Sequence, residues 1–166
     1  MTRALRFVLA CALAVAPAAC ANGPSGGAAA TGACDDARFA RDRSAFTAGT
    51  LSGDQPEDVC GTVTRVRRAR ETRSGAHGYF DVRLPAGGTV EVIANLDAMA
   101  RTRTDAPPGW PWVAPGDAVE VRGRYFFDAP GRDGIDWVEG DVGRSWPYPG
   151  FVTVCTANRT RCATYR

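Results

Sequence analysis

The chain contains no lysine, and His77 is the single histidine among its 166 residues. Acid–base or nucleophilic catalysis of the Ser–His kind would therefore depend on His77 alone. No Gly-x-Ser-x-Gly motif, Cys–His pair or phosphate-cradling glycine loop accompanies it. A lone histidine more often caps a strand end or bonds a loop, so the sequence favours a chain without catalytic residues and without a cofactor.

The chain also lacks a large net charge of either sign. The formal charge of +2 includes Arg3 and Arg6, and all 20 basic residues are arginines that face 18 acidic residues. Without Arg3 and Arg6 the two signs balance. A neutral chain has no general electrostatic attraction for nucleic acid, so the charge does not favour a nucleic-acid partner.

No apolar run is long enough to span a membrane. The longest candidate, Phe7–Ala16, falls short of the roughly 18 residues that a spanning helix needs. Arg3 and Arg6 precede it, and small residues follow it, which is the pattern of a signal peptide over residues 1–19. The sequence therefore predicts export from the cytoplasm.

The signal segment ends in Pro17-Ala18-Ala19-Cys20, which resembles the lipobox of bacterial lipoproteins. Lipidation of Cys20 would anchor the protein to the membrane of the cell envelope. Proline replaces the usual aliphatic residue of that motif, and the alternative is ordinary cleavage and secretion. Residues 20–33 are rich in glycine and alanine and predict a flexible tether. Residues 34–166 then form a single domain.

Four cysteines remain in that domain, namely Cys34, Cys60, Cys155 and Cys162. An even count in an oxidising compartment indicates disulfides, with three connectivities open. The close spacing of Cys155 and Cys162 suits a tight hairpin, which favours that pair together with Cys34–Cys60. No C-x-x-C pair exists, so a metal site is not favoured.

Four runs alternate apolar and polar residues at period two, which is typical of strands with one buried and one wet face. They contain Phe80 to Leu84, Val90 to Val92, Val119 to Phe127 and Ile135 to Trp137. Strands are also expected at Val59 to Val66 and Phe151 to Val154, and helices at residues 35–48 and 96–101. The predicted core is Phe80, Val82, Val92, Val121, Ile135 and Trp137.

The densest basic stretch runs from Arg65 through Arg67, Arg68 and Arg70 to Arg73. It is either a loop that binds an anionic ligand or a solvated hairpin tip. In the proline-rich segment after residue 101, Trp110 and Trp112 either cap the barrel or offer stacking surfaces. An acidic cluster of Asp133, Asp136, Glu139 and Asp141 would suit a hard cation, but without EF-hand spacing a solvated edge is favoured.

Five strands with a helix between the third and fourth follow the order of an OB-fold barrel. The expected fold is thus mainly β, a five-stranded OB-like barrel with a short N-terminal helix and a small disulfide-closed C-terminal hairpin. An ordered set of motif residues takes the match further, namely His77, Phe80, Asn95, Asp97, Gly116, Asp117, Val119, Gly123, Tyr125, Ile135, Trp137 and Asp141.

This set resembles a family of small exported bacterial proteins that carry a domain of unknown function, predicted to be OB-like. The family pattern reads His-x-x-Phe, His-Asn-Ile-Asp, Gly-Asp-x-Val, Gly-x-Tyr and Ile-His-Trp-Thr-His-His-Asp. This chain departs from it at Ala94, Asp136, Glu139 and Gly140, where the family has histidines. The resemblance implies no activity, and the departures argue against carrying over a histidine-based metal or acid–base role.

Two functions follow as expectations. The first is a non-catalytic module at the cell envelope that binds a protein, a glycan or a small anionic ligand. The second is a single-stranded nucleic-acid binder that uses Tyr79, Phe126 and the arginine stretch. The expected binding residues are Arg65, Arg67, Arg68, Arg70, Tyr79, Trp110 and Phe126.

Overall fold

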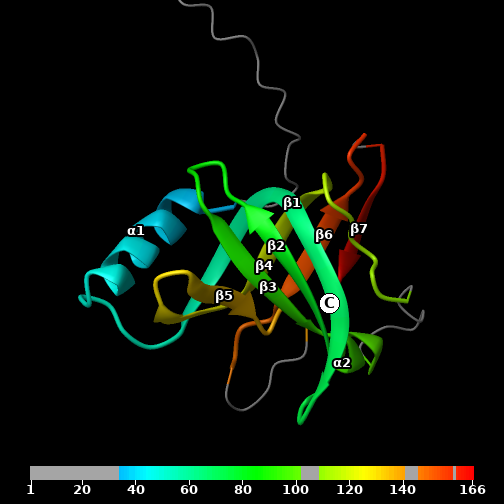
Figure 1. The fold of residues 1–166 in the computed structure, drawn as a ribbon, viewed down its shortest axis with the longest axis horizontal. Coiled ribbons are helices and arrows are strands. Elements are labelled where there is room, and N and C mark those ends of the chain that lie inside the picture. The colour runs from blue at the N-terminus through cyan, green and yellow to red at the C-terminus, as the bar shows by residue number, and fades with distance from the viewer. Residues whose placement is uncertain (1–33, 102–108, 141–145, 159) are drawn as a thin grey trace, which may run out of the picture.

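The computed structural model describes residues 34–101, 109–140, 146–158 and 160–166. The predictions for the signal segment, the tether, Cys20 and Asp141 lie outside these residues. The elements in chain order are α1 (Asp36–Thr47), β1 (Gln55–Thr72), β2 (Gly75–Arg83), β3 (Thr89–Asn95), α2 (Leu96–Arg101), β4 (Ala118–Ala129), β5 (Arg132–Asp136), β6 (Phe151–Cys155) and β7 (Cys162–Tyr165) (Figure 1).

The seven strands form one sheet in which five strands pair in a ring. The order around the ring is β1-β2-β3-β5-β4, and β4 pairs with β1 to complete it. β3 and β5 run parallel, whereas the other neighbours are antiparallel. β6 and β7 extend the sheet from β4. The mainly β prediction and the position of α2 between the third and fourth strands are confirmed.

The period-two alternation identified most of the core. Phe80, Val82, Val92, Val121 and Ile135 are fully buried, as predicted. The prediction for Trp137 is wrong, because its side chain is only half-buried and Val138 fills the interior instead. Trp137 has a φ of 52°, so the backbone turns there, after the end of β5, and the alternation breaks.

Helix α1 packs over one open end of the ring. Asp35 caps its first turn by accepting a 2.9 Å hydrogen bond from the Arg38 amide. The buried rings of Phe39 and Phe46 meet the ring of Tyr125 edge-on at centroid distances of 4.9 and 5.5 Å. Burying each phenylalanine contributes about 1.5–3 kcal/mol, so these two side chains hold the helix to the sheet.

Two tryptophans pack against the other end of the ring. Trp110 and Trp112 lie 6.4 and 6.1 Å from Phe80, measured between ring centroids. Trp112 stacks on Tyr165 of β7 at 4.2 Å, and the Trp110 indole N–H donates to the Arg67 carbonyl oxygen at 2.9 Å. Of the two alternatives for these residues, capping is the one the structure shows.

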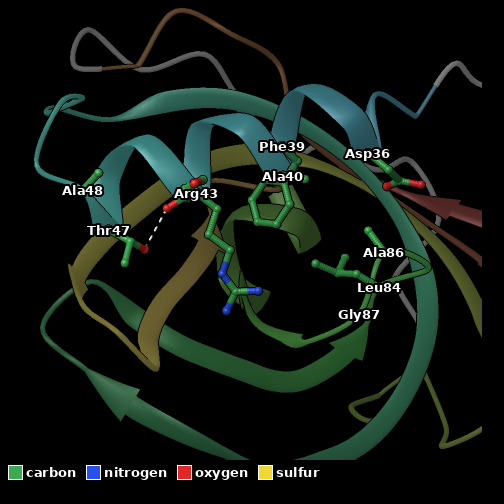
Figure 2. A pocket seen from close by; sticks show the side chains of 10 residues that line it. Asp36, Phe39, Ala40, Arg43, Thr47, Ala48, Leu84, Ala86 and Gly87 are labelled. Carbon is green, nitrogen blue, oxygen red and sulfur yellow. Dashed lines mark hydrogen bonds between the residues drawn. The ribbon is translucent and has the colours of Figure 1, made fainter.

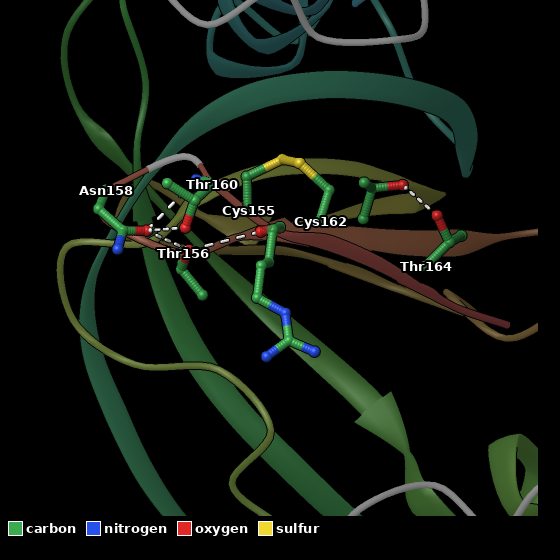
Figure 3. Close-up of a disulfide and its surroundings, with 8 residues drawn as sticks. Cys155, Thr156, Asn158, Thr160, Cys162 and Thr164 are labelled. Atoms are coloured by element: carbon green, nitrogen blue, oxygen red, sulfur yellow. Dashed lines mark hydrogen bonds between the residues drawn. A yellow bond between two sulfur atoms is a disulfide. The ribbon is translucent and has the colours of Figure 1, made fainter.

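Both favoured disulfides are present. Cys34–Cys60 joins the start of α1 to β1, and Cys155–Cys162 closes the hairpin of β6 and β7 (Figure 3). Two disulfides fit an oxidising, extracellular environment. Neither helix in the described part of the chain is long and apolar enough to cross a membrane.

Candidate functional site

Most of the arginine stretch lies in a strand, and only Arg73 lies in the turn between β1 and β2. β1 continues to Thr72, well past the predicted end at Val66, and pairs with β2 down to Gly75. Arg65, Arg67 and Arg70 stand opposite Asp81, Tyr79 and His77 in this pairing, with a register shift between Arg67 and Arg70. Pairing with β2 therefore continues β1 through the arginine-rich segment, although apolar and polar residues do not alternate in that segment.

Tyr79 lies on the outer face of the ring, the side of the strands opposite to buried side chains such as Phe80. Its ring has two guanidinium groups over it, those of Arg67 and Arg70, each 5.6 Å from the ring centroid. Such cation–π contacts orient both the aromatic ring and the arginine side chains. Tyr79 and Arg67 are half-buried and Arg70 is exposed, so the Arg70 guanidinium stays accessible to a partner.

Arg67 also joins two carboxylates on the same face. Its Nη2 lies 2.6 Å from the Asp81 carboxylate and also pairs with Glu91 of β3. Asp81 and Glu91 stand directly opposite each other across β2 and β3. The positive charge of Arg67 is therefore compensated within the protein, and this arginine is unavailable as a simple anion-binding charge.

Other arginines of the stretch have no ion-pair partner among the residues that the structure describes. Arg65, Arg68 and Arg70 are exposed, and within the described residues none of them forms an ion pair. Arg65 and Arg70 belong to the same face as Tyr79 by their pairing with β2. The outer face consequently combines free guanidinium groups with the neutralised Arg67–Asp81–Glu91 cluster.

Phe126 lies on this outer face as well. A Cβ on Gly134 would come within 2.6 Å of the Phe126 ring and 3.0 Å of the Glu91 carbonyl oxygen, so the ring lies across the glycine backbone between β4 and β3. Tyr79 on β2 is three strands away from Phe126 on β4, a separation of roughly 14 Å at the usual strand spacing. Only an extended ligand could contact both rings.

A polar cavity of about 360 Å³ opens beside the Arg67 cluster. Its wall mixes both signs of charge and includes the turn between β4 and β5. The lining residues are Arg67, Asp81, Thr89, Glu91, Gly131, Arg132 and Asp133. Such a wall offers hydrogen-bond donors and acceptors together, which suits a ligand rich in hydroxyl groups better than a bare anion.

The motif residues His77, Asn95 and Asp97 meet at the turn between β1 and β2. The His77 imidazole is 2.8 Å from the Gly75 carbonyl oxygen, and Asp97 accepts from the Ala76 amide at 3.0 Å. Asn95 donates to the Ser74 carbonyl oxygen and accepts from the Ala98 amide at the start of α2. These residues fix the hairpin tip to α2, and His77 bonds a loop as expected.

The acidic residues of the predicted cluster have separate partners. Asp133 accepts from the Tyr125 hydroxyl at 2.9 Å and pairs with Arg43, and Asp136 pairs with Arg124 at 2.6 Å. Glu139 is buried, and this burial raises its pKa, with the Asp136 charge acting in the same direction. The favoured interpretation of a solvated edge is wrong, since Asp133 and Glu139 are buried among protein groups.

The sequence pattern did not identify the buried carboxylates of Glu57 and Glu120 or the role of the half-buried Arg43. Glu57 of β1 is fully buried, and burial together with a hydrogen bond to Asp42 raises its pKa to about 8, although Arg38 acts to lower it. Period two places Glu57 on the same face as buried Val59 and Val63, which is a signal that could have located it. Arg43 of α1 shares the helix face of Phe39 and reaches Asp133.

Among the described residues, one group of side chains has possible metal-ligand atoms close enough together to share an ion. Ligand atoms of Cys34, Asp58 and Glu120 lie within 4.8 Å of one another. The Cys34 sulfur is bonded to Cys60, and Asp58 pairs with Arg122. A disulfide sulfur is a poor substitute for a thiolate ligand, so this grouping does not form a metal centre.

Comparison with known proteins identifies no family. No family model matches the chain, and no curated protein or solved structure is significantly similar to it. The resemblance to the exported bacterial family thus stays a prediction from the motif residues. Function has to be inferred from the residues and geometry of the chain itself.

Proposed function

We propose that this chain is a non-catalytic binding module of the cell envelope, built on an OB-like barrel that recognises an oligosaccharide carrying acidic groups. OB barrels bind oligonucleotides and oligosaccharides on the face of their second and third strands. The ring order, the parallel pair of β3 and β5 and the helix before β4 support this fold. The candidate surface covers the equivalent strands.

One observation carries the proposal. Tyr79 lies between β1 and β3 with the guanidinium groups of Arg67 and Arg70 over its ring, beside the polar cavity. Sugar hydroxyl groups can donate to Asp81 and Glu91 and can accept from arginine N–H groups. The exposed guanidinium of Arg70 adds a planar, charged donor for a carboxylate or sulfate group on the saccharide.

The position of His77 supports a function without bond chemistry. Its Nδ1 is held between the Gly75 carbonyl oxygen at 2.8 Å and the Thr72 hydroxyl at 3.1 Å. The other ring nitrogen, Nε2, lies 3.4 Å from the Ser74 hydroxyl of the same turn. A general base needs a nitrogen within reach of a substrate proton, whereas both nitrogens of His77 contact groups of the hairpin turn. Export, and lipid anchoring through Cys20, belong to the same proposal, with the two disulfides as supporting evidence.

A second candidate is binding of single-stranded nucleic acid. The observation in its favour is that Tyr79 and Phe126 share the outer face with exposed arginines, as aromatic platforms do in such proteins. Against it stands the balance of charges, both in the whole chain and in the Arg67–Asp81–Glu91 cluster. Binding to DNA at physiological salt should accordingly be weak.

Fluorescence anisotropy with labelled probes tests the proposal. We expect an oligogalacturonate or a sulfated oligosaccharide to bind at physiological salt, a neutral oligosaccharide to bind more weakly, and oligo-dT to bind weakly. Tyr79→Ala and Arg70→Gln should each weaken saccharide binding by about tenfold, equivalent to one cation–π or charge-assisted contact. Arg161→Gln, an exposed arginine near the hairpin of β6 and β7, is the matched control.

The panel separates the two candidates. Submicromolar, length-dependent binding of oligo-dT with no saccharide binding would move the protein to the nucleic-acid class. Absence of binding to every acidic saccharide would overturn the proposed ligand. Equal losses in Arg70→Gln and Arg161→Gln would contradict the proposed surface.

A further inference from the structure

A second cavity lies away from the outer face, between α1 and the turn that joins β2 to β3 (Figure 2). Its volume of about 480 Å³ is within the range of small-molecule sites, roughly 300–1,000 Å³. Figure 2 shows Phe39 and Arg43 extending from α1 toward this space, which Leu84 and Ala86 border from the other side. The cavity does not include any residue of the proposed saccharide surface.

The wall of this cavity is mostly apolar. Phe39 and Ala40 of α1 and Ala48, which caps its C-terminus, contribute from one side, and Leu84 and Ala86 contribute from the turn. Phe39 and Leu84 are themselves buried in the core, at 1% and 6% exposure, so the floor of the cavity is fixed by packing. A hydrocarbon group placed here would leave water for a preformed apolar surface.

Arg43 is the one cation of the lining, and its orientation is fixed by the sheet. Its Nη2 donates to the Thr89 carbonyl oxygen at 3.0 Å and to Asp133 at 3.1 Å, and its Nε lies 2.8 Å from Asp133. Asp133 is held in turn by the Tyr125 hydroxyl. The remaining guanidinium nitrogen, Nη1, has no hydrogen-bond partner within the described residues, which leaves two N–H donors for a ligand.

The other end of the lining carries the opposite charge. Asp36 lies seven residues before Arg43 on α1, about 10 Å along the helix axis. Its carboxylate accepts a hydrogen bond from the Cys60 amide at 3.0 Å, which holds it in place. A second anionic group on a ligand would be repelled at this end, so the cavity favours a molecule with one acidic head.

We propose that this cavity binds a small apolar monocarboxylic acid, such as a medium-chain fatty acid. Its carboxylate accepts from Nη1 of Arg43, and its hydrocarbon chain lies along α1 against Phe39, Leu84 and Ala86. The two cavities share no lining residue, but they meet at Arg43, whose partners Thr89 and Asp133 line the polar cavity. A variant at Ala40 leaves these contacts in place, so it tests the acid site while saccharide binding stays measurable.

Isothermal titration of the full-length, disulfide-intact chain with decanoate below its micellar concentration tests this site. We expect saturable binding of one decanoate per chain, with decanol at least tenfold weaker because its hydroxyl cannot accept the paired, charge-assisted hydrogen bonds that a carboxylate accepts from Nη1 of Arg43. Equal affinity for decanoate and decanol would overturn recognition by Arg43, and absence of decanoate binding would overturn the site.

Matched variants locate the binding. Ala40→Trp fills the cavity from α1 and should abolish binding of decanoate, while Ala37→Trp, on an exposed position of the same helix, should not. Arg43→Gln should remove the preference for decanoate over decanol, whereas Arg41→Gln should keep it. Far-UV circular dichroism confirms the fold of each variant. Unchanged decanoate binding in a folded Ala40→Trp variant would place the ligand elsewhere and contradict the proposal.

Discussion

The guanidinium of Arg67 lies 5.6 Å from the centre of the Tyr79 ring, directly across the pairing of β1 with β2. The same side chain reaches Asp81 on β2 and Glu91 on β3. One arginine thus connects three neighbouring strands on the outer face of the ring. It orders the aromatic and acidic groups that the proposed ligand would contact.

Because Arg67 connects three strands, its substitution should lower the stability of the protein. Arg67→Gln leaves Asp81 and Glu91 opposite each other without a cation, and both carboxylates are partly buried. The free energy of unfolding should fall by about 1–2 kcal/mol, as for the loss of a charge-assisted hydrogen bond. Urea unfolding measures it, with the exposed Arg65→Gln as control. Equal effects of both substitutions would show that the cluster adds no stability.

Buried Glu57 predicts an unusual dependence of stability on pH. Its pKa in the folded protein is about 8, chiefly because burial disfavours the carboxylate, whereas the ordinary value is 4.5. Between these values the folded state retains a proton that the unfolded chain has lost. The free energy of unfolding therefore decreases as the pH rises from 4.5 to 8, by on the order of a few kcal/mol from this residue.

Glu57→Gln isolates this effect. Glutamine keeps the shape and the neutral state, so the decline in stability between pH 5 and pH 8 should become shallower. Glu71→Gln, at an exposed position of the same strand, should keep the slope of the parent protein. Parallel pH profiles for Glu57→Gln and the parent would contradict the raised pKa.

The two disulfides should contribute unequally. In the chain-entropy picture, Cys34–Cys60, with a sequence separation of 26, stabilises by about 3.5 kcal/mol, and Cys155–Cys162, with a separation of seven, by about 2.4 kcal/mol. Thermal unfolding of the two paired Cys→Ser variants compares them. Non-reducing peptide mapping of the parent should find no alkylatable thiol at Cys34, Cys60, Cys155 or Cys162.

Lipidation of Cys20 is a prediction from sequence. Cys20→Ser should move the protein from the membrane fraction to the soluble fraction of cells that process bacterial lipoproteins. Mass spectrometry of the parent should find an acylated N-terminal cysteine. A soluble parent protein that begins at another residue would show that ordinary cleavage and secretion is correct.

The sequence predicted those parts of the fold in which local pattern and burial coincide. Phe80, Val82 and Val92 alternate with polar residues, and this alternation identified β2 and β3. The extension of β1 beyond Val66 could not be predicted in this way. Arginines occupy both faces of the strand there, so apolar and polar residues no longer alternate. Trp137 was misplaced because its left-handed backbone interrupts the alternation.

The candidate site was predictable only in part. Tyr79 and Phe126 were predicted to lie on a strand face, and their positions on β2 and β4 agree with this prediction. The compensation of Arg67 by Asp81 and Glu91 joins residues that are 14 and 24 positions apart, and only the register of three strands brings them together. Arg43 and the cavity beside α1 similarly depend on how the helix lies against the ring.

The most direct test of binding at the outer face is an NMR titration of the ¹⁵N-labelled protein with the acidic oligosaccharide that binds best. Binding at the outer face should change the chemical shifts of the backbone amides of Tyr79, Asp81 and Glu91, with smaller changes or none at α1 and in the hairpin of β6 and β7. Changes confined to α1 or to that hairpin, with Tyr79 unaffected, would contradict binding at the outer face.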